Sequence, residues 1–382
     1  MAEKPLRILV INTGSTSTKI AQFENTRRID QTDLVVPMES LQGKTRAVEQ
    51  LADRTASVRE YLSSHGQSIE DFDIVSARGG PLPPCEGGAY LVNDLMLDVL
   101  RYAPLSQHES SLSSMIGHEL TKGTGIPTII YDAINSDEFK EEAKWTGVAG
   151  IRFLARGHIL NTRQVGHAAA KDLGKRYQDC RFIIAHFGGS FSVSSHECGR
   201  ITDIYNAFNG PMSPQRAGML PTTDVVDLCF SGKYQSAAQV NRMLNKESGL
   251  MGFLGTQDGR EAMRRFAMGE DAAVRAVRQM AYQSAKAIGA LAAGMNGQVD
   301  AILYTGGLAY SQQFTDLVSE RVRFLAPIRA YPGEFEMEAL AAGAVRVMNG
   351  EETAKTYTAI PQQFADKEAF DAYVRQCKEE QA

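Results

Sequence analysis

The sequence predicts an α/β fold made of two domains of one plan, and three observations support this prediction. The chain has 382 residues, which at about 150 residues per domain suggests two domains or three. A pattern of strand, polar turn and strand near the start returns about halfway along the chain. Strands alternate with helix-like segments, as they do in layered α/β proteins.

The first hairpin is predicted at the start of the chain. Residues 7–11 are apolar and β-branched, and residues 19–23 resume a strand. Residues 12–18 between them are small and polar around Gly14. Such a turn can direct backbone N–H groups and hydroxyls at an anion.

The second hairpin has the same pattern, with a turn at residues 186–190. Its strands, with one more after them, are predicted at 182–185, 191–195 and 199–203. His186 follows Asn12 by 174 positions (186 minus 12), close to half of the chain. The spacing indicates an internal duplication.

The remaining segments alternate in the same way. We expect strands at 126–131 and 301–308, helices at 271–295 and 335–348, and a peripheral helix or frayed end at 351–382. Glycines cluster around residues 150–165, near the expected domain boundary. The predicted limits are therefore 1–158 for the N-terminal domain, 159–334 for the C-terminal domain, and 335–382 for a helix returning to the first domain plus a polar tail.

Composition and missing motifs exclude several classes of protein. Hydrophobic residues make up 43% and charged residues 22%, as in an ordinary globular chain. The net charge of -5 argues against nucleic acid as a partner, and no apolar run approaches the roughly 18 residues of a membrane span. Five scattered cysteines without a Cys-x-x-Cys pair favour a reducing, cytoplasmic location. The sequence has no P-loop, no Gly-x-Gly-x-x-Gly after a strand and no His-Glu-x-x-His.

Three glycine turns follow predicted strands, at Gly14, at Gly188 and Gly189, and at Gly306 and Gly307. Glycine lets the backbone approach a phosphate closely, but one such turn alone is more often an ordinary hairpin. Three turns, two of them in matching places of a duplicated plan, favour a nucleotide cleft between the domains.

Two arginines and two other side chains are candidates for chemistry. Arg78 precedes two glycines, and Arg216 lies in a loop with a glycine two positions on; an arginine in such a place can grip a planar anion with two hydrogen bonds. A lone loop arginine is more often a solvated surface charge, and His158 alone is more often a satisfied, partly buried residue. Asp132 follows a predicted strand, where ligands of α/β proteins gather.

Together these segments resemble the acetokinase family of carboxylate kinases, and within it the butyrate kinases. The resemblance runs from about residue 7 to residue 357. It rests on motifs in the family's order at residues 12–19 (Asn-Thr-Gly-Ser-Thr-Ser-Thr-Lys), 77–80 (Ala-Arg-Gly-Gly), 87–90, 213–218, 305–311 and 331–340.

The resemblance implies a duplicated actin-like, ribonuclease H-like fold with ATP in an interdomain cleft. It implies a first phosphate loop with Asn12, Ser15, Ser17 and Lys19, a second with His186, Gly188 and Gly189, and nucleotide contacts from Asp258, Arg260, Gly306 and Gly307. It implies a catalytic group of Arg78, Asp132, His158 and Arg216. Magnesium is expected at Glu336, with Glu334 and Asn12 as further candidates.

The implied reaction is phosphorylation of a short-chain carboxylate by Mg-ATP, which gives an acyl phosphate and ADP. A carboxylic acid has a pKa of about 4 to 5, so the acceptor is already a nucleophile at neutral pH. Arg78 and Arg216 would bind the carboxylate and the phosphoryl group in transfer, and His158 would donate to a phosphoryl oxygen. Asp132 and Glu336 would position magnesium, and Asn12 would orient the phosphate.

Two residues depart from the family's pattern. Ser190 replaces a glycine of the second phosphate loop and adds a hydroxyl. Gly157 stands where the family usually has phenylalanine near the acyl pocket. We expect either that Gly157 widens the pocket for longer or branched acids, or that another side chain fills the gap.

Several alternatives stay open at this point. The preferred acid could be butyrate, a branched homologue or valerate, or instead acetate or propionate. Another actin-like ATPase, such as a sugar kinase or a chaperone-type ATPase, is the runner-up, and a silent nucleotide-binding protein is a third reading. The family implies a homodimer or higher homo-oligomer, which nothing in the composition tests.

Overall fold

The computed structural model describes residues 4–44, 46–206 and 208–380. The chain packs into two compact units: unit 1 comprises residues 1–137 and 336–382, and unit 2 comprises Glu138–Phe335. Residues 138–158, which the sequence-based limits assign to the first domain, pack with unit 2. There Phe139, Ala155 and Ile159 share a small core with Ile201 and Ile204.

Unit 1 contains a seven-stranded sheet in the order β12-β5-β6-β4-β1-β2-β3. Its strands are β1 (Arg7–Thr13), β2 (Ser17–Glu24), β3 (Arg27–Val35), β4 (Ile74–Arg78), β5 (Ala89–Leu91), β6 (Thr128–Tyr131) and β12 (Lys355–Thr356). Its helices are α1 (Met38–Leu41), α2 (Leu51–Ser64), α3 (Asp94–Tyr102), α4 (Ser111–Thr121), α13 (Glu336–Met348) and α14 (Lys367–Glu379), with 3-10 turns at Ala47–Gln50 and Ile69–Asp71.

Unit 2 contains a five-stranded sheet in the order β11-β10-β7-β8-β9. Its strands are β7 (Arg181–Phe187), β8 (Phe191–Glu197), β9 (Arg200–Tyr205), β10 (Ala301–Gly306) and β11 (Ile328–Pro332). Its helices are α5 (Glu141–Lys144), α6 (Ile159–Asp172), α7 (Thr222–Phe230), α8 (Ala237–Lys246), α9 (Leu250–Leu254), α10 (Gly259–Ala267), α11 (Asp271–Gly294) and α12 (Gln312–Val322), with 3-10 turns at Tyr177–Asp179 and Gly307–Tyr310.

The two sheets have one topology, which confirms the predicted duplication. In unit 1, β1, β2 and β3 are antiparallel neighbours, and β4 and β6 extend the other side of β1 in parallel. In unit 2, β7, β8 and β9 form the same meander, and β10 and β11 extend β7 in parallel. Even the irregularity recurs, because the register shifts between the second and third strands of both meanders.

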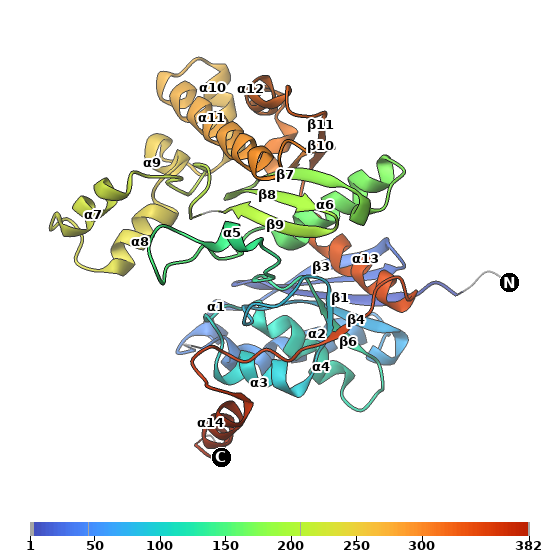
Figure 1. Cartoon of the computed structure of the whole chain (residues 1–382). Coiled ribbons are helices and arrows are strands. Elements are labelled where there is room, and N and C mark those ends of the chain that lie inside the picture. Colours follow the sequence, from blue (N-terminus) through green and yellow to red (C-terminus); the bar gives the residue numbers. More distant parts are fainter. Residues whose placement is uncertain (1–3, 45, 207, 381–382) are drawn as a thin grey trace. The chain divides into compact units, whose positions relative to one another are not determined.

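Helices cover both faces of each sheet (Figure 1). In unit 1, α2 and α4 pack over one face, and α13 packs against β1, β4 and β6 from the other, where the Ser76 hydroxyl donates to the Leu340 carbonyl at 2.8 Å. In unit 2, α11 covers the face of Ile183 and Phe187, and α6 covers the face of Phe182 and Ile184. Two faces buried by helices account for the nearly continuous apolar character of β1, β7 and β10.

Most predicted elements are confirmed, and the exceptions have a simple cause. The long helix predicted at 271–295 is α11, and the polar tail contains α14, which buries Phe370 and Val374. β3 is not predicted from the sequence, because this edge strand has a polar, largely exposed pattern. Within the described part of the chain, none of the helices is both long enough and apolar enough to cross a membrane.

Candidate functional site

The first hairpin loop is held in place by a buried cation. Residues 14–16 form the loop between β1 and β2. Arg54 of α2 contacts this hairpin, and only 1% of the surface of Arg54 is exposed. Its guanidinium donates to the carbonyl oxygens of Ser15 (3.1 Å) and Ser17 (3.0 Å) and to the hydroxyl of Thr18 (3.1 Å). The predicted phosphate-loop residues Ser15 and Ser17 are therefore fixed through their backbone, by a residue that motif reading did not select.

A carboxylate joins two predicted site residues in unit 1. The Glu336 carboxylate, at the start of α13, forms an ion pair with the Arg78 guanidinium. The same Glu336 oxygen accepts a hydrogen bond from the Asn12 amide at 3.0 Å. Asn12 and Arg78 lie near the ends of the neighbouring strands β1 and β4. The fold thus brings Asn12, Arg78 and Glu336 together, and all three side chains are only half-buried.

Asp132 is held in a special backbone conformation directly after β6. Its φ angle is 47°, a region that favours glycine, and its residue surface is 2% exposed. One carboxylate oxygen accepts a hydrogen bond from the Gly88 backbone N–H at 2.8 Å. A left-handed, buried aspartate at a strand's carboxyl end is typical of functional sites.

His108 is a further candidate in unit 1 that is not predicted from the sequence. Its Nδ1 lies 2.7 Å from the Ser110 hydroxyl. Desolvation lowers the pKa of His108, the Glu109 carboxylate opposes this shift, and the Arg78 charge lowers the pKa further. No local motif marks this histidine in the sequence, since its relation to Arg78 arises only in the fold.

Two predicted histidines stack in unit 2. The rings of His158 and His186 lie 3.8 Å apart, centroid to centroid, and are inclined by only 16°. His158 precedes α6, and its Nδ1 lies 2.8 Å from the hydroxyl of Ser192 on β8. Its Nε2 lies 3.3 Å from the hydroxyl of Ser190, the residue that departs from the family's glycine. Because Ser190 replaces glycine, its hydroxyl lies within hydrogen-bonding distance of Nε2 of His158, the nitrogen that we expected to donate to phosphate.

The buried histidine is held by a helix residue. The Asn161 amide of α6 lies 3.0 Å from the Nδ1 of His186, whose surface is 2% exposed. Burial lowers the pKa of His186 well below its usual value, and the charge of His158 lowers it further. His186 is therefore a neutral side chain near pH 7.

A cavity of about 490 Å³ in unit 2 collects the predicted nucleotide contacts. Its volume is in the range of small-molecule and cofactor sites. Polar groups come from four separate segments, at residues 188–189, 257–260, 310–311 and 334, and apolar walls come from Met263 and Leu308. The lining includes the predicted residues Gly188, Gly189, Asp258, Arg260, Gly307 and Glu334, but not His186 or Gly306.

Glycine is required where two of these loops meet. Gly306 has a φ angle of 86°, and a Cβ there would lie 2.6 Å from the carbonyl carbon of Phe187. The Gly306 and Gly333 backbones exchange hydrogen bonds of 3.0 and 3.1 Å. The end of β10 can therefore press against the end of β7, which holds the adjacent glycine turns together.

Asp258 begins the helix that forms another wall of this cavity. It is the N-cap of α10, and its carboxylate accepts a hydrogen bond from the Arg260 N–H at 2.8 Å. That backbone hydrogen bond is the main reason why the pKa of Asp258 lies below its usual value. The aspartate therefore stays ionised, and both Asp258 and Arg260 are exposed at the cavity.

Arg216 does not line the 490 Å³ cavity. Its guanidinium donates to the Asn245 carbonyl and lies 5.9 Å from the centre of the Phe208 ring. Among the described residues none accepts a hydrogen bond from its buried Nε atom. Burial lowers the pKa of Arg216 from its ordinary value.

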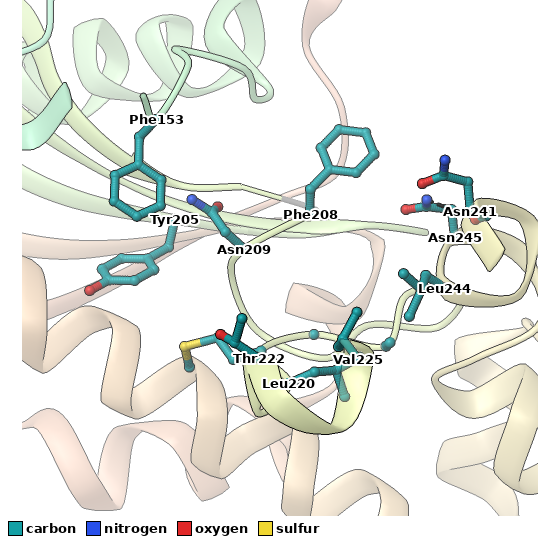
Figure 2. A pocket seen from close by; sticks show the side chains of 13 residues that line it. Phe153, Tyr205, Phe208, Asn209, Leu220, Thr222, Val225, Asn241, Leu244 and Asn245 are labelled. Carbon is teal, nitrogen blue, oxygen red and sulfur yellow. Dashed lines mark hydrogen bonds between the residues drawn. The ribbon is translucent and has the colours of Figure 1, made fainter. Parts of the chain in front are cut away.

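Phe208 and Asn245 also line a larger cavity of about 610 Å³ (Figure 2). Figure 2 shows the aromatic rings of Phe153, Tyr205 and Phe208 on one side and Leu220 and Val225 on the other. Tyr205 packs toward the α11 core, whereas its neighbour Ile204 belongs to the cluster with Ile159. Successive strand residues face opposite sides, so this cavity lies across β9 from Gly157.

The side chain of Ile204 lies next to the position that a Cβ atom of residue 157 would occupy. A Cβ at Gly157 would lie 3.3 Å from Cγ2 of Ile204. Ile204 thus takes up part of the room that the family's phenylalanine would need. This contact favours the second of our two expectations for Gly157, in which another side chain fills the gap.

The structure separates the two glutamates that the sequence could not distinguish. Glu334 lines the 490 Å³ cavity of unit 2, and Glu336 belongs to the Asn12 and Arg78 cluster of unit 1. Across residues 4–44, 46–206 and 208–380, no group of three or more His, Cys, Asp or Glu side chains gathers as a metal cage. The Glu336 carboxylate alone still fits Mg²⁺, which usually takes one or two protein carboxylates together with substrate phosphates.

Comparison with known proteins gives a consistent picture. The model of the acetokinase family matches residues 138–341, more than half of the chain. The fold is similar to that of the acetate kinase of Porphyromonas gingivalis, at a TM-score of 0.74 and 19% identity over 90% of this chain and 100% of that chain. A propionate kinase from Francisella tularensis matches at a TM-score of 0.67 and 18% identity, covering 88% and 98%. Acetate kinase from Entamoeba histolytica matches at 0.72 and 15% identity, with the same coverage. The predicted duplicated actin-like fold is thus confirmed.

Proposed function

The chain belongs to the acetokinase family of carboxylate kinases, and we propose that it phosphorylates butyrate or a branched-chain homologue with Mg-ATP. The observation that supports nucleotide use most directly is the 490 Å³ cavity. Its lining joins Gly188, Asp258, Arg260 and Gly307, which belong to separate sequence motifs. Glycine backbone beside a helix N-terminus suits phosphate, and the apolar wall suits a nucleoside.

We assign separate roles in the in-line transfer of the phosphoryl group to individual residues of this chain. The acceptor carboxylate needs no general base, so the main task is to offset repulsion between two anions. We assign Arg78 and Arg216 to the carboxylate and the phosphoryl oxygens, and His158 to donation toward an equatorial oxygen. Before substrate binds, the ion pair with Glu336 holds the Arg78 guanidinium in place, and the carboxylate of the substrate can then compete for it.

Mg²⁺ would be held by the carboxylates of Glu336 and Asp132, and the Asn12 side chain lies beside Glu336. When bound, the ion supplies positive charge to the polyphosphate. The Asn12 NH₂ group donates to the Glu336 carboxylate at 3.0 Å and so helps to fix the orientation of that carboxylate.

The acid preference is the finer part of the proposal. Gly157 leaves out a side chain beside His158, and the neighbouring wall is the aliphatic Ile204. We propose a pocket that accepts acids longer than acetate, because Ile204 takes up only part of the space left by the missing side chain at Gly157 and thereby sets the depth of the pocket. Since one methylene is worth about 1–3 kcal/mol in such pockets, the preference should be graded.

The test is acyl-phosphate formation with Mg-ATP, trapped with hydroxylamine, over straight and branched acids of two to six carbons. We expect a maximum at butyrate or a branched acid and no phosphorylation of glucose. A maximum at acetate or propionate would keep the reaction and overturn the acid assignment. Sugar phosphorylation without acyl phosphate would point to the sugar-kinase alternative, and ATP binding without any transfer would point to a silent homologue.

Substitution of Arg78 tests the reaction, and substitutions of Ile204 and Gly157 test the acid preference. Arg78→Ala should lower kcat/KM at least about 100-fold with every acid, whereas Arg28→Ala, which removes an exposed ion pair with Glu338, should not. Ile204→Ala should move the maximum toward longer acids. Gly157→Phe should move it toward acetate if Ile204 can give way, and the Gly157→Phe, Ile204→Ala double variant makes that room.

A further inference from the structure

Asn161 has an orientation that its neighbours determine without ambiguity. The backbone N–H of Phe335 donates to its side-chain oxygen at 2.8 Å, and a backbone N–H can only donate. The oxygen of the amide therefore faces Phe335. The NH₂ group must then face the opposite way, toward His186 and Thr305, at 3.0 and 3.2 Å.

This orientation decides the tautomer of His186. The Asn161 NH₂ group can only donate, so the Nδ1 of His186 must be the acceptor and carry no proton. In a neutral imidazole the proton then resides on Nε2. That atom lies beside Gly188, because a Cβ at Gly188 would be 2.5 Å from it.

We infer that Asn161 is a positioning residue that holds the proton of His186 on Nε2, so that an uncharged N–H donor faces the start of the Gly188–Gly189 loop beside His158. The inference rests on the proposed function to the extent that the loop receives a nucleotide phosphate. Gly188 is then needed because any side chain there would cover the donor.

The stacked arrangement explains why an uncharged donor is used. The His158 and His186 rings are 3.8 Å apart, so two imidazolium ions at these positions would repel each other strongly. With His186 neutral, His158 alone can carry charge in the stack. Asn161 suits this role better than an aspartate, which would favour a proton on Nδ1 and a positive charge on His186.

The test is ¹⁵N NMR of the full chain labelled at its seven histidines, with His186 assigned from its missing signal in His186→Gln. We expect the wild-type His186 to show a protonated Nε2 and an unprotonated Nδ1, with no titration between pH 8 and 5.5. A protonated Nδ1 in the wild-type protein would overturn the inference, and this measurement requires neither substrate nor a variant at Asn161.

Asn161→Asp is the decisive variant, because it keeps the acceptor for Phe335 N–H and replaces the donor to His186 by an acceptor. We expect Nδ1 of His186 to become protonated and kcat for acyl phosphate to fall by about 100-fold, with an altered pH profile. Thr305→Val is the control, since it removes the other partner of the Asn161 NH₂ group and should leave the His186 tautomer unchanged.

The outcomes separate this inference from the proposed function. If Asn161→Asp switches the tautomer but leaves ATP affinity, kcat and the pH profile unchanged, the positioning role is wrong although the contact is right. If the wild-type protein forms no acyl phosphate, the proposed function fails. The role of Asn161 is then judged by the affinity for ATP, measured by calorimetry with both variants, and an unchanged affinity in Asn161→Asp would overturn it.

Discussion

The two hairpin loops have the same place in the same topology, yet they are supported in opposite ways. Loop 14–16 in unit 1 lies over a permanent buried cation, the Arg54 guanidinium. Loop 188–190 in unit 2 lies beside the neutral imidazole of His186, which is oriented by the Asn161 amide. Burial lowers the pKa of Arg54, and the Glu109 carboxylate opposes that shift, so this side chain keeps its charge.

This difference shows what a duplicated fold conserves and what it leaves free. The strand order, the parallel extension and the register shift recur in both sheets. The chemistry beneath each loop does not, because it depends on single side chains from helices that differ between the units. Fixed charge in unit 1 is insensitive to pH, whereas the buried imidazoles of unit 2 are sensitive to acid.

The largest effect is expected on breaking the support in unit 1. Arg54→Met should lower the free energy of unfolding by about 4 kcal/mol, because the Ser15 and Ser17 carbonyls and the Gln50 amide oxygen lose a buried donor. It should also weaken ATP binding. Urea unfolding and calorimetry measure the two effects.

The matched control is Arg59→Met, on the same helix. Arg59 is exposed and donates to the Glu119 carbonyl. Its substitution should change the free energy of unfolding by less than about 0.5 kcal/mol. Equal losses in the two variants would mean that the loop does not depend on the buried cation.

A smaller loss is expected where the unit 2 loop meets β10. Gly306→Ala should lower the free energy of unfolding by about 3 kcal/mol, because it combines a positive φ with a backbone clash at Phe187. Gly307→Ala has open space around its Cβ and should be nearly neutral. In unit 1, the Cβ added in Gly14→Ala would lie at an ordinary 3.7 Å from its nearest atom. Thermal melting should therefore show a much larger loss of stability for Gly306→Ala than for Gly307→Ala or Gly14→Ala.

The smallest effect is a response to acid that originates in unit 2. Burial lowers the pKa values of His186 and His196 well below the usual value. Between pH 6.5 and the lower folded pKa the unfolded chain binds more protons, so stability is full above pH 6.5 and falls on acidification. Each histidine can account for at most about 2 kcal/mol between pH 6.5 and 5.

Urea unfolding at pH 7, 6 and 5 checks this response. His196→Gln should reduce the dependence of stability on pH, whatever it does to the stability at pH 7. An unchanged slope in His196→Gln would show that the buried imidazole does not produce the acid response.

Contiguous motifs made much of the site predictable. The turn around Gly14, the Gly188–Gly189 turn and the Asp258 helix start are each encoded within a few residues, and the structure shows a turn or helix start at each place. Arg54, His108 and Asn161 have no such local mark. Their contacts bridge 39 residues from Arg54 to Ser15 and 25 residues from Asn161 to His186, so no motif could have selected them.

The sequence by itself determined the duplicated α/β plan, the family and the positions of the glycine turns, because strand periodicity and turn chemistry are local properties of the chain. Only the tertiary structure decided which glutamate joins Asn12, 324 positions away, and that Ile204 stands beside Gly157. The tautomer of His186 was likewise decided only by the tertiary structure. Contacts of this kind depend on how distant segments pack, and packing is a property of the whole fold rather than of any segment.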